Sequence, residues 1–246
     1  MHTTTHNIKT ADDVNICFDH LTNNHENLVV VAHGFFNSRR GRLIQALGKF
    51  LSQHYDVILM DFRGHGDSGG VFTWTAKEFL DLEAVLSFAR PRYKKIGVIG
   101  FSLGGATSLI TAARSELIDS LFVISVPTQL SKIEYHFWNL NFENDILYSL
   151  IRDGKIGKGV RSGAFWLKKE KPIEAASKIK IPVFYLHGTM DWIIRSWHSQ
   201  ELYKKTVSYK RMHILENGPH AEYLIRKKRD ETLKLIGDWF EETLRE

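Results

Sequence analysis

The residues that decide the fold are Gly100-Phe101-Ser102-Leu103-Gly104-Gly105, because of what lies on either side of them. Residues 95–99 before them read Lys-Ile-Gly-Val-Ile, a short apolar and β-branched run that is typical of a buried strand. Residues 106–114 after them are rich in alanine and predict a helix. A serine at this corner between strand and helix fits the Gly-x-Ser-x-Gly pattern of a nucleophile elbow.

The glycines around Ser102 give the pattern its physical sense. A serine at a sharp corner sits in strained backbone geometry, so side chains two residues before and two residues after it must be absent. Gly100 and Gly104 provide that room. The hydroxyl would then project above the sheet, and the backbone N–H of Leu103 would face a developing oxyanion. The alternative is a glycine-rich turn that contains a serine by chance, and the rest of the chain argues against it.

Length and composition describe an ordinary globular protein. The 246 residues suit one α/β domain with an insertion or two small domains, and 43% are hydrophobic and 25% charged. No apolar run approaches the length of a membrane span, and no basic segment followed by an apolar one opens the chain. Cys17 is the only cysteine, which excludes an internal disulfide and agrees with a reducing compartment. We therefore expect a cytoplasmic protein with no integral membrane segment.

The net charge of +5 raises the question of nucleic-acid binding. Basic residues cluster locally at 92–95, 168–171 and 226–229, but no cluster alternates with stacking aromatic residues in a known binding motif. A solvated surface is the simpler interpretation, with attraction of anionic substrates as a second use of the charge. We expect no nucleic-acid partner.

Strands and helices alternate along most of the chain. Apolar runs predict strands at 28–32, 56–60, 95–99, 121–126, 181–186 and around 211–215, with a weaker one at 14–18. Helices are predicted at about 40–53, 75–89, 106–114, 196–205 and 222–244. This alternation indicates an α/β fold, with a mostly parallel central sheet covered by helices on both faces.

The partners of Ser102 should follow strands. A serine hydroxyl needs a base within hydrogen-bond reach, and the base needs its other ring nitrogen held by a carboxylate. Ligands of open α/β sheets bind at the carboxyl ends of the strands. Asp191 follows the strand at 181–186, and His220 follows the strand at 211–215. Ser102, Asp191 and His220 thus stand in the chain order of this class of elbow.

Twelve histidines compete for the role of base. His33 precedes Gly34 in the loop expected to supply an oxyanion donor, so we interpret it as a residue that positions backbone. His65 lies in a Gly-His-Gly turn, and His187 ends the strand before Asp191, so both are interpreted as structural. The others are placed less well than His220.

Five motifs in order along the chain resemble the α/β-hydrolase superfamily, in particular carboxylesterases, monoacylglycerol lipases and cinnamoyl/feruloyl esterases. They are His33-Gly34-Phe35, Asp61-x-Arg63-Gly64-His65-Gly66-x-Ser68, residues 100–105, Gly188-Thr189-Met190-Asp191 and Pro219-His220. The resemblance implies an α/β-hydrolase fold with Ser102 as nucleophile, His220 as base and Asp191 as the acid that orients it. It also implies an oxyanion hole made by the backbone N–H groups of Phe35 and Leu103. The chain departs from many relatives by carrying proline, not glycine, directly before the histidine.

The alternation of strands and helices breaks at 127–180, which is too long for a simple crossover. The resemblance places an inserted cap (lid) here and assigns 1–126 and 181–246 to the core domain. The cap range is rich in aromatic residues, which would either fill its own small core or line an apolar acyl or aryl pocket. On the second interpretation Trp138 and Trp166 are candidate substrate-binding residues.

We therefore expect a serine hydrolase that cleaves carboxylic esters of small-to-medium hydrophobic or aryl substrates through an acyl-enzyme on Ser102. The same three residues would also suit a thioesterase or acyltransferase. A non-catalytic receptor or scaffold of this fold usually has a damaged triad, whereas here all parts are present. The histidines lack paired ligand spacing, and residues 64–70 lack a phosphate-binding Gly-Lys-Ser/Thr, so no metal or cofactor is expected. The expected partner is a small-molecule ester, and no feature specifies an oligomeric state.

Overall fold

A computed structural model describes residues 1–133 and 160–245, and its centre is an eight-stranded sheet in the order β1-β2-β4-β3-β5-β6-β7-β8. The strands are β1 (His2–Lys9), β2 (Asn15–Thr22), β3 (Leu28–Ala32), β4 (Asp56–Met60), β5 (Ile96–Phe101), β6 (Ser120–Ile124), β7 (Val183–Gly188) and β8 (Lys210–Leu215). β1 and β2 pair antiparallel with each other, and β2 pairs antiparallel with β4. All other neighbouring strands are parallel, which confirms the mostly parallel sheet.

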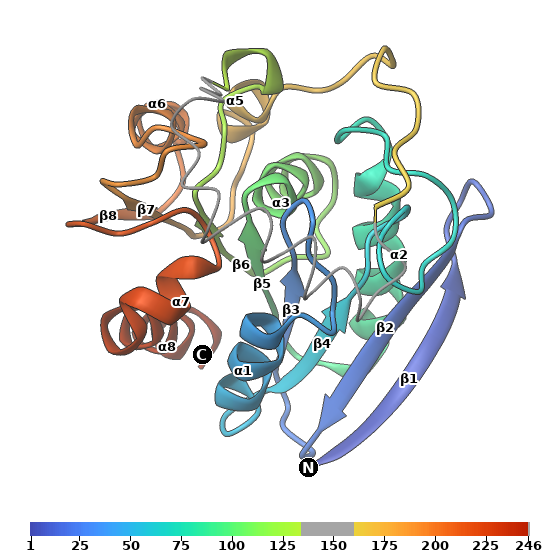
Figure 1. Cartoon of the computed structure of the whole chain (residues 1–246). Helices are drawn as coiled ribbons and strands as arrows, with labels where there is room; N and C mark the ends of the chain where they lie inside the picture. The colour runs from blue at the N-terminus through green and yellow to red at the C-terminus, as the bar shows by residue number, and fades with distance from the viewer. Residues whose placement is uncertain (134–159, 246) are drawn as a thin grey trace.

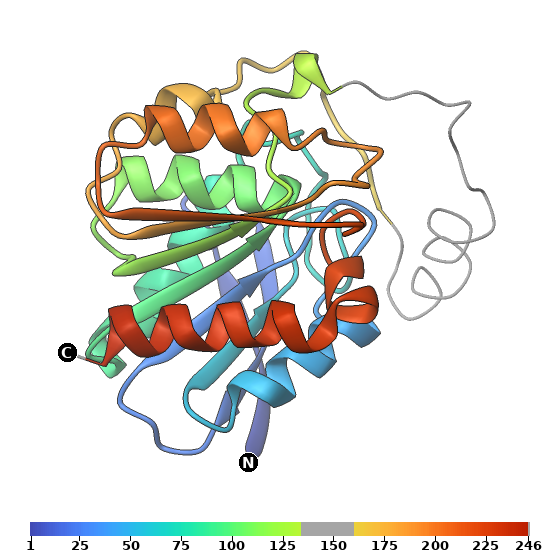
Figure 2. The same ribbon diagram turned by 90° about the vertical axis from the view of Figure 1, so that its left-hand side faces the viewer.

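Helices cover both faces of this sheet (Figures 1 and 2). One face carries α1 (Arg42–Leu51), α7 (Tyr223–Lys227) and α8 (Arg229–Leu244), and the other carries α2 (Glu78–Ala89), α3 (Leu103–Arg114), α5 (Pro172–Ala176) and α6 (Trp197–Lys205). Two short 3-10 turns are η1 (Arg90–Arg92) and η2 (Leu130–Lys132). Within the described part of the chain, no helix is both long and apolar enough to cross a membrane.

The central strands are buried on both faces, as their continuous apolar sequences predict. In β3, Val29 and Val31 pack with α1, α7 and α8, whereas Val30 packs with the helices of the opposite face. Because every side chain of β3 is removed from water, the hydrophobic effect favours burial at each position of the strand. α5 lies within the predicted cap range, yet its Ala176 belongs to this core.

Three elements differ from the sequence-based expectation. β1 was not predicted, because its residues are mostly polar and exposed at the sheet edge, where no apolar alternation is required. α2 begins at Glu78 rather than near 75, because Trp74 and Thr75 have φ values of 59° and 71°, which a helix does not accept. The predicted C-terminal helix is two helices, separated at Lys228 by φ −131° and ψ 44°.

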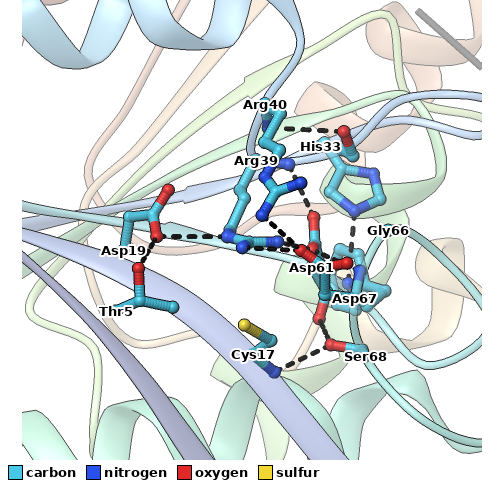
Figure 3. A network of polar contacts seen from close by, with 12 residues as sticks. Thr5, Cys17, Asp19, His33, Arg39, Arg40, Asp61, Gly66, Asp67 and Ser68 are labelled. Atoms are coloured by element: carbon cyan, nitrogen blue, oxygen red, sulfur yellow. Dashed lines mark hydrogen bonds and ion pairs between the residues drawn. The ribbon is translucent and has the colours of Figure 1, made fainter. Parts of the chain in front are cut away.

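A buried ion-pair network connects the loop after β3 to the loop after β4 (Figure 3). The Arg39 guanidinium is only 2% exposed and contacts the carboxylates of Asp61, Asp67 and Asp19. Asp61 also accepts the backbone N–H of Arg39 at 2.7 Å and that of Asp67 at 3.0 Å. Because charges in the interior must be paired to be tolerated, this network fixes the two loops relative to each other.

α3 packs closely on the sheet because glycines stand where it meets the strands. A Cβ atom at Gly104 would lie 2.3 Å from the carbonyl oxygens of Ala32 and His33. A Cβ atom at Gly100 would lie 2.5 Å from the Cα atom of Gly105. At both glycines, neighbouring backbone therefore occupies the place that a side chain would take, as the sequence pattern predicts.

We expect Gly104→Ala to lower the free energy of unfolding by about 3 kcal/mol, because backbone atoms cannot move aside as a flexible side chain can. Gly237→Ala is the matched control, since Gly237 lies inside α8 and its Cβ would meet the nearest atom, in Phe50, at 3.7 Å. The control should raise the free energy of unfolding by about 0.5–1 kcal/mol. Urea unfolding measures both, and equal effects of the two substitutions would contradict the close packing.

Candidate active site

Ser102 lies at the corner between β5 and α3, with φ 51° and ψ −115°. This left-handed conformation is strained for serine and marks functional sites in many proteins. The backbone N–H of Ser102 donates to Ile124 O at 2.8 Å, and the Ser102 carbonyl accepts the N–H of Ala106 at 3.0 Å. The structure thus has the strand-turn-helix geometry that the sequence pattern predicts.

The Asp191 carboxylate lies in the loop after β7 and is 1% exposed. Its Oδ1 accepts the N–H groups of Ile193 and Ile194 at 3.1 and 2.8 Å. Its Oδ2 lies 2.7 Å from Nδ1 of His220, in the loop after β8. Burial alone would raise the pKa of Asp191, but the two histidines beside it outweigh burial and hold the pKa well below its usual range.

His187 is a second histidine on the same carboxylate. Its Nε2 lies 3.2 Å from Asp191 Oδ2 and 2.7 Å from the carbonyl oxygen of Ile194, while its Nδ1 lies 2.7 Å from Ser199 Oγ. Because a carbonyl only accepts, Nε2 carries a proton and donates it to Ile194 O. The sequence interpretation treated His187 as structural and missed its contact with the acid; the only local signal was its spacing of four residues from Asp191.

The loops that carry Asp191 and His220 are bonded to each other along their backbones. Met190 N–H donates to Gly218 O at 2.9 Å, and Thr189 N–H donates to Leu215 O at 3.0 Å. A Cβ atom at Gly188 would lie 2.1 Å from Gly218 O, so this approach needs glycine. His220 reaches Asp191 even though a proline precedes it.

The elbow and the His220 loop are anchored at the same strand end. Ser102 N–H bonds to Ile124, the last residue of β6, while Ala221 N–H donates to Ser125 Oγ at 3.0 Å. Ser125 and Ala221 both have positive φ, 56° and 46°. The structure thus places the candidate nucleophile and the loop of the candidate base over one end of β6, and sequence reasoning had missed Ser125.

The loop after β3 lies beside Ser102. A Cβ atom at Gly34 would lie 3.4 Å from Ser102 Cβ, so the two residues are near contact. Among the described residues, no acceptor takes the backbone N–H of Phe35 or that of Leu103. Unbonded N–H groups at a helix N-terminus and in an adjoining loop can receive a developing negative charge.

Two buried histidines support this loop. His33 Nε2 accepts the N–H of Phe62 at 3.2 Å, so its Nδ1 carries the proton and donates to Gly34 O at 2.7 Å. Burial lowers the pKa of His33 to about 4. Burial, with His33 as neighbour, lowers the pKa of His65 to about 3. Both side chains are therefore neutral at pH 7.

A cavity of about 390 Å³ lies next to Trp74. The Phe35 ring packs against Trp74 with ring centroids 5.2 Å apart, and Trp74 lines the cavity. The other lining residues are Thr75, Gln129, Leu130, Ser131, Phe165, Lys169, Glu170 and Lys171. Phe165 is thus placed at the cavity, whereas Trp166 beside it is not among the lining residues described, although the two are similarly exposed, at 68% and 74%. Trp138 lies outside the described residues.

Within residues 1–133 and 160–245, no three histidine, cysteine or acidic side chains are grouped so that they could hold a metal ion. The residues brought together at the sheet edge are those of acid–base and nucleophilic chemistry: a serine, a histidine, a carboxylate and backbone donors.

An elbow serine after the central strand β5 and an Asp–His pair after β7 and β8 define the architecture of the α/β hydrolases. A model of the alpha/beta hydrolase family matches residues 29–231, and the chain belongs to this family.

Relatives of known sequence and structure agree with this assignment. In an alignment 211 positions long, the chain is 28% identical to the protein YqkD of Bacillus subtilis; the alignment covers 79% of this chain but less than two thirds of YqkD (65%). In an alignment 265 positions long, it is 26% identical to the caffeoylshikimate esterase of Arabidopsis thaliana, with coverage of 88% of this chain and 78% of that enzyme. The Pyrococcus furiosus esterase Pf2001 has the same fold, with a TM-score of 0.81, 23% identity and coverage of 98% of this chain and 91% of its own.

We expect the contribution of His33 and His65 to the free energy of unfolding to fall as the pH is lowered from 6.5 toward 4. Their folded-state pKa values lie below the ordinary 6.5, so in this range each of the two side chains binds more protons in the unfolded chain than in the folded protein. Each histidine should account for about 2 kcal/mol at pH 5. Urea unfolding between pH 7 and pH 5 tests this. Between pH 7 and pH 5 the wild type should lose more stability than His65→Gln, whereas the exposed His54→Gln should follow the wild type. The same change with pH in His65→Gln and wild type would contradict the expectation.

Proposed function

We propose that this protein is a serine esterase that hydrolyses carboxylic esters through an acyl-enzyme on Ser102. The observation that carries the proposal is the buried Asp191–His220 hydrogen bond of 2.7 Å, anchored to the same strand end as the elbow serine. The family membership of the chain supports hydrolysis, and the likeness to a caffeoylshikimate esterase supports an ester substrate.

The proposed reaction begins when His220 Nε2 accepts the proton of the Ser102 hydroxyl as its oxygen attacks the ester carbonyl. The N–H groups of Phe35 and Leu103 stabilise the oxyanion of the tetrahedral intermediate. Collapse breaks the ester bond, and His220 gives its proton to the leaving alcohol. A water molecule, deprotonated by His220, then releases the acid and restores Ser102. Asp191 holds Nδ1–H of His220, and its lowered pKa keeps it ionised throughout.

We further propose that the range 127–180, apart from α5, whose Ala176 belongs to the core of the sheet, forms a cap whose described residues help to enclose the substrate. Gln129, Phe165 and Lys169 of this range line the cavity together with Trp74. A volume of about 390 Å³ lies in the range of small-molecule sites, and its aromatic side chains suit an acyl or aryl group. These features support small-to-medium hydrophobic or aryl esters as substrates.

We expect Ser102→Ala to abolish labelling by a fluorophosphonate probe and to lower kcat for p-nitrophenyl butyrate by about 10³–10⁶-fold. His220→Ala should lose a similar factor, and the double variant should be no worse, because the residues act as a unit. Ser177→Ala, an exposed serine, is the matched control and should behave as wild type. Full labelling of the Ser102 variant, or a larger loss of kcat in His33→Ala or His65→Ala than in His220→Ala, would contradict the assignment.

The cavity predicts that kcat/KM rises from p-nitrophenyl acetate through butyrate and hexanoate to octanoate until the cavity is full. Each methylene that is buried contributes up to about 0.8 kcal/mol, close to fourfold in kcat/KM. Phe165→Ala should flatten this profile more than Trp166→Ala, because only Phe165 of the two lines the cavity described above. Trp138→Ala tests the remaining candidate. A profile that is flat in wild type and unchanged by all three substitutions would show that these aromatics serve only the cap itself.

A further inference from the structure

Three consecutive residues, His220, Ala221 and Glu222, each bond to a different loop at the edge of the sheet. His220 bonds to Asp191 in the loop after β7, and Ala221 bonds to Ser125 after β6. Glu222 reaches the loop after β3: its Oε1 accepts the backbone N–H of Gly34 at 2.9 Å. This last bond has no part in the reaction proposed above, although it joins the segment that follows the base to the residue before Phe35.

The Glu222 carboxylate is buried against the loop that carries Phe35. It is 7% exposed, and the same Oε1 also lies 3.2 Å from the Asn37 side-chain nitrogen, which donates to it. Gly34 is the contact point, since a Cβ atom there would lie 3.0 Å from Oε1 and 3.4 Å from Ser102 Cβ. One carboxylate therefore holds both ends of the segment 34–37 directly beside the candidate nucleophile.

The backbone of segment 34–37 needs contacts from outside the segment to keep its conformation. Phe36 has φ 62°, a left-handed conformation that bulky residues rarely adopt and that persists only when surrounding contacts determine it. Gly34 is buried, so its N–H would be left without water or a partner if Glu222 were removed. With the Gly34 N–H bound to Glu222, the next N–H along the chain is that of Phe35, which takes no acceptor among the described residues.

We propose that Glu222 is a positioning residue that fixes the oxyanion loop and so sets the place of the Phe35 N–H. The inference rests on the proposed esterase function. Glu222 contributes through its hydrogen bonds rather than through its charge. A negative charge beside a developing oxyanion would destabilise that oxyanion, whereas an N–H donor held in a fixed place stabilises it. Because both donors meet Oε1, the amide oxygen of a glutamine can accept both bonds without the charge.

The test compares Glu222→Ala, Glu222→Asp and Glu222→Gln with p-nitrophenyl butyrate as substrate. Ala lacks the acceptor and Asp is too short to reach Gly34, so both should lower kcat by about 10–100-fold with KM within about threefold. Gln should stay within about threefold of wild type. Butylboronic acid, which forms a tetrahedral adduct with the serine, should bind more weakly to the Ala and Asp variants in parallel with the loss of kcat. Glu216→Ala, an exposed acid before His220, is the matched control and should change neither quantity.

The outcomes separate the inference from the function on which it rests. Full kcat in Glu222→Ala or Glu222→Asp, in a protein that loses activity on Ser102→Ala, overturns the role of Glu222 alone. Equal losses in Gln and Ala, or unchanged boronate affinity, also overturn positioning by the hydrogen bond. Activity that survives Ser102→Ala overturns the esterase proposal itself. If the Ala variant fails to fold, the comparison of Glu222→Asp with Glu222→Gln still tests the inference. Asp keeps the negative charge but is too short to reach Gly34, whereas Gln keeps the length and lacks the charge.

Discussion

The backbone of Ser102 is the constraint on which the rest of the site depends. A left-handed serine costs on the order of 1–3 kcal/mol and persists only where its surroundings determine it. Here the Ser102 N–H is bound by Ile124, and Gly100 and Gly104 let α3 approach the strands closely enough to hold the turn. The geometry of the elbow is thus a property of the packed sheet. Any side chain that acts on Ser102 must come from loops at the same edge.

Buried polar contacts hold those loops in place. A buried polar group without a partner is costly, so the buried polar groups of these loops bond to one another. Each of these hydrogen bonds or ion pairs therefore pairs a buried polar group and also fixes the position of a loop. Arg39 joins the loops after β3 and β4 through Asp61, and Asp191 accepts hydrogen bonds from two backbone groups and two histidines. Such a site is held by several independent bonds before a substrate arrives, which favours preorganised rather than induced geometry.

Much of the fold can be predicted from the sequence, because strands that are buried on both faces have continuous apolar sequences. The strand at 28–32 matches β3, and the pattern around Ser102 predicts both β5 and α3. The misses have physical causes. β1 is a polar edge strand that is held in place by its pairing with β2. Residues 2–9 show no alternation of apolar and polar side chains from which a strand could be predicted. The start of α2 is displaced by the left-handed pair Trp74 and Thr75, whose backbone depends on the loop around them rather than on helix propensity.

At the site, the sequence predicts residues that follow a recognisable strand, but it does not predict contacts between residues far apart in the chain. Ser102, Asp191 and His220 are visible because each stands at a fixed offset from a predictable strand end. The residues that hold them are not, because Glu222 meets Gly34 across 188 residues and Ala221 meets Ser125 across 96. Those contacts exist only after the parallel sheet has brought its strand ends together, and no local pattern encodes them. A change at Glu222 or Ser125 would therefore leave every recognisable motif intact while altering the geometry on which the motif depends.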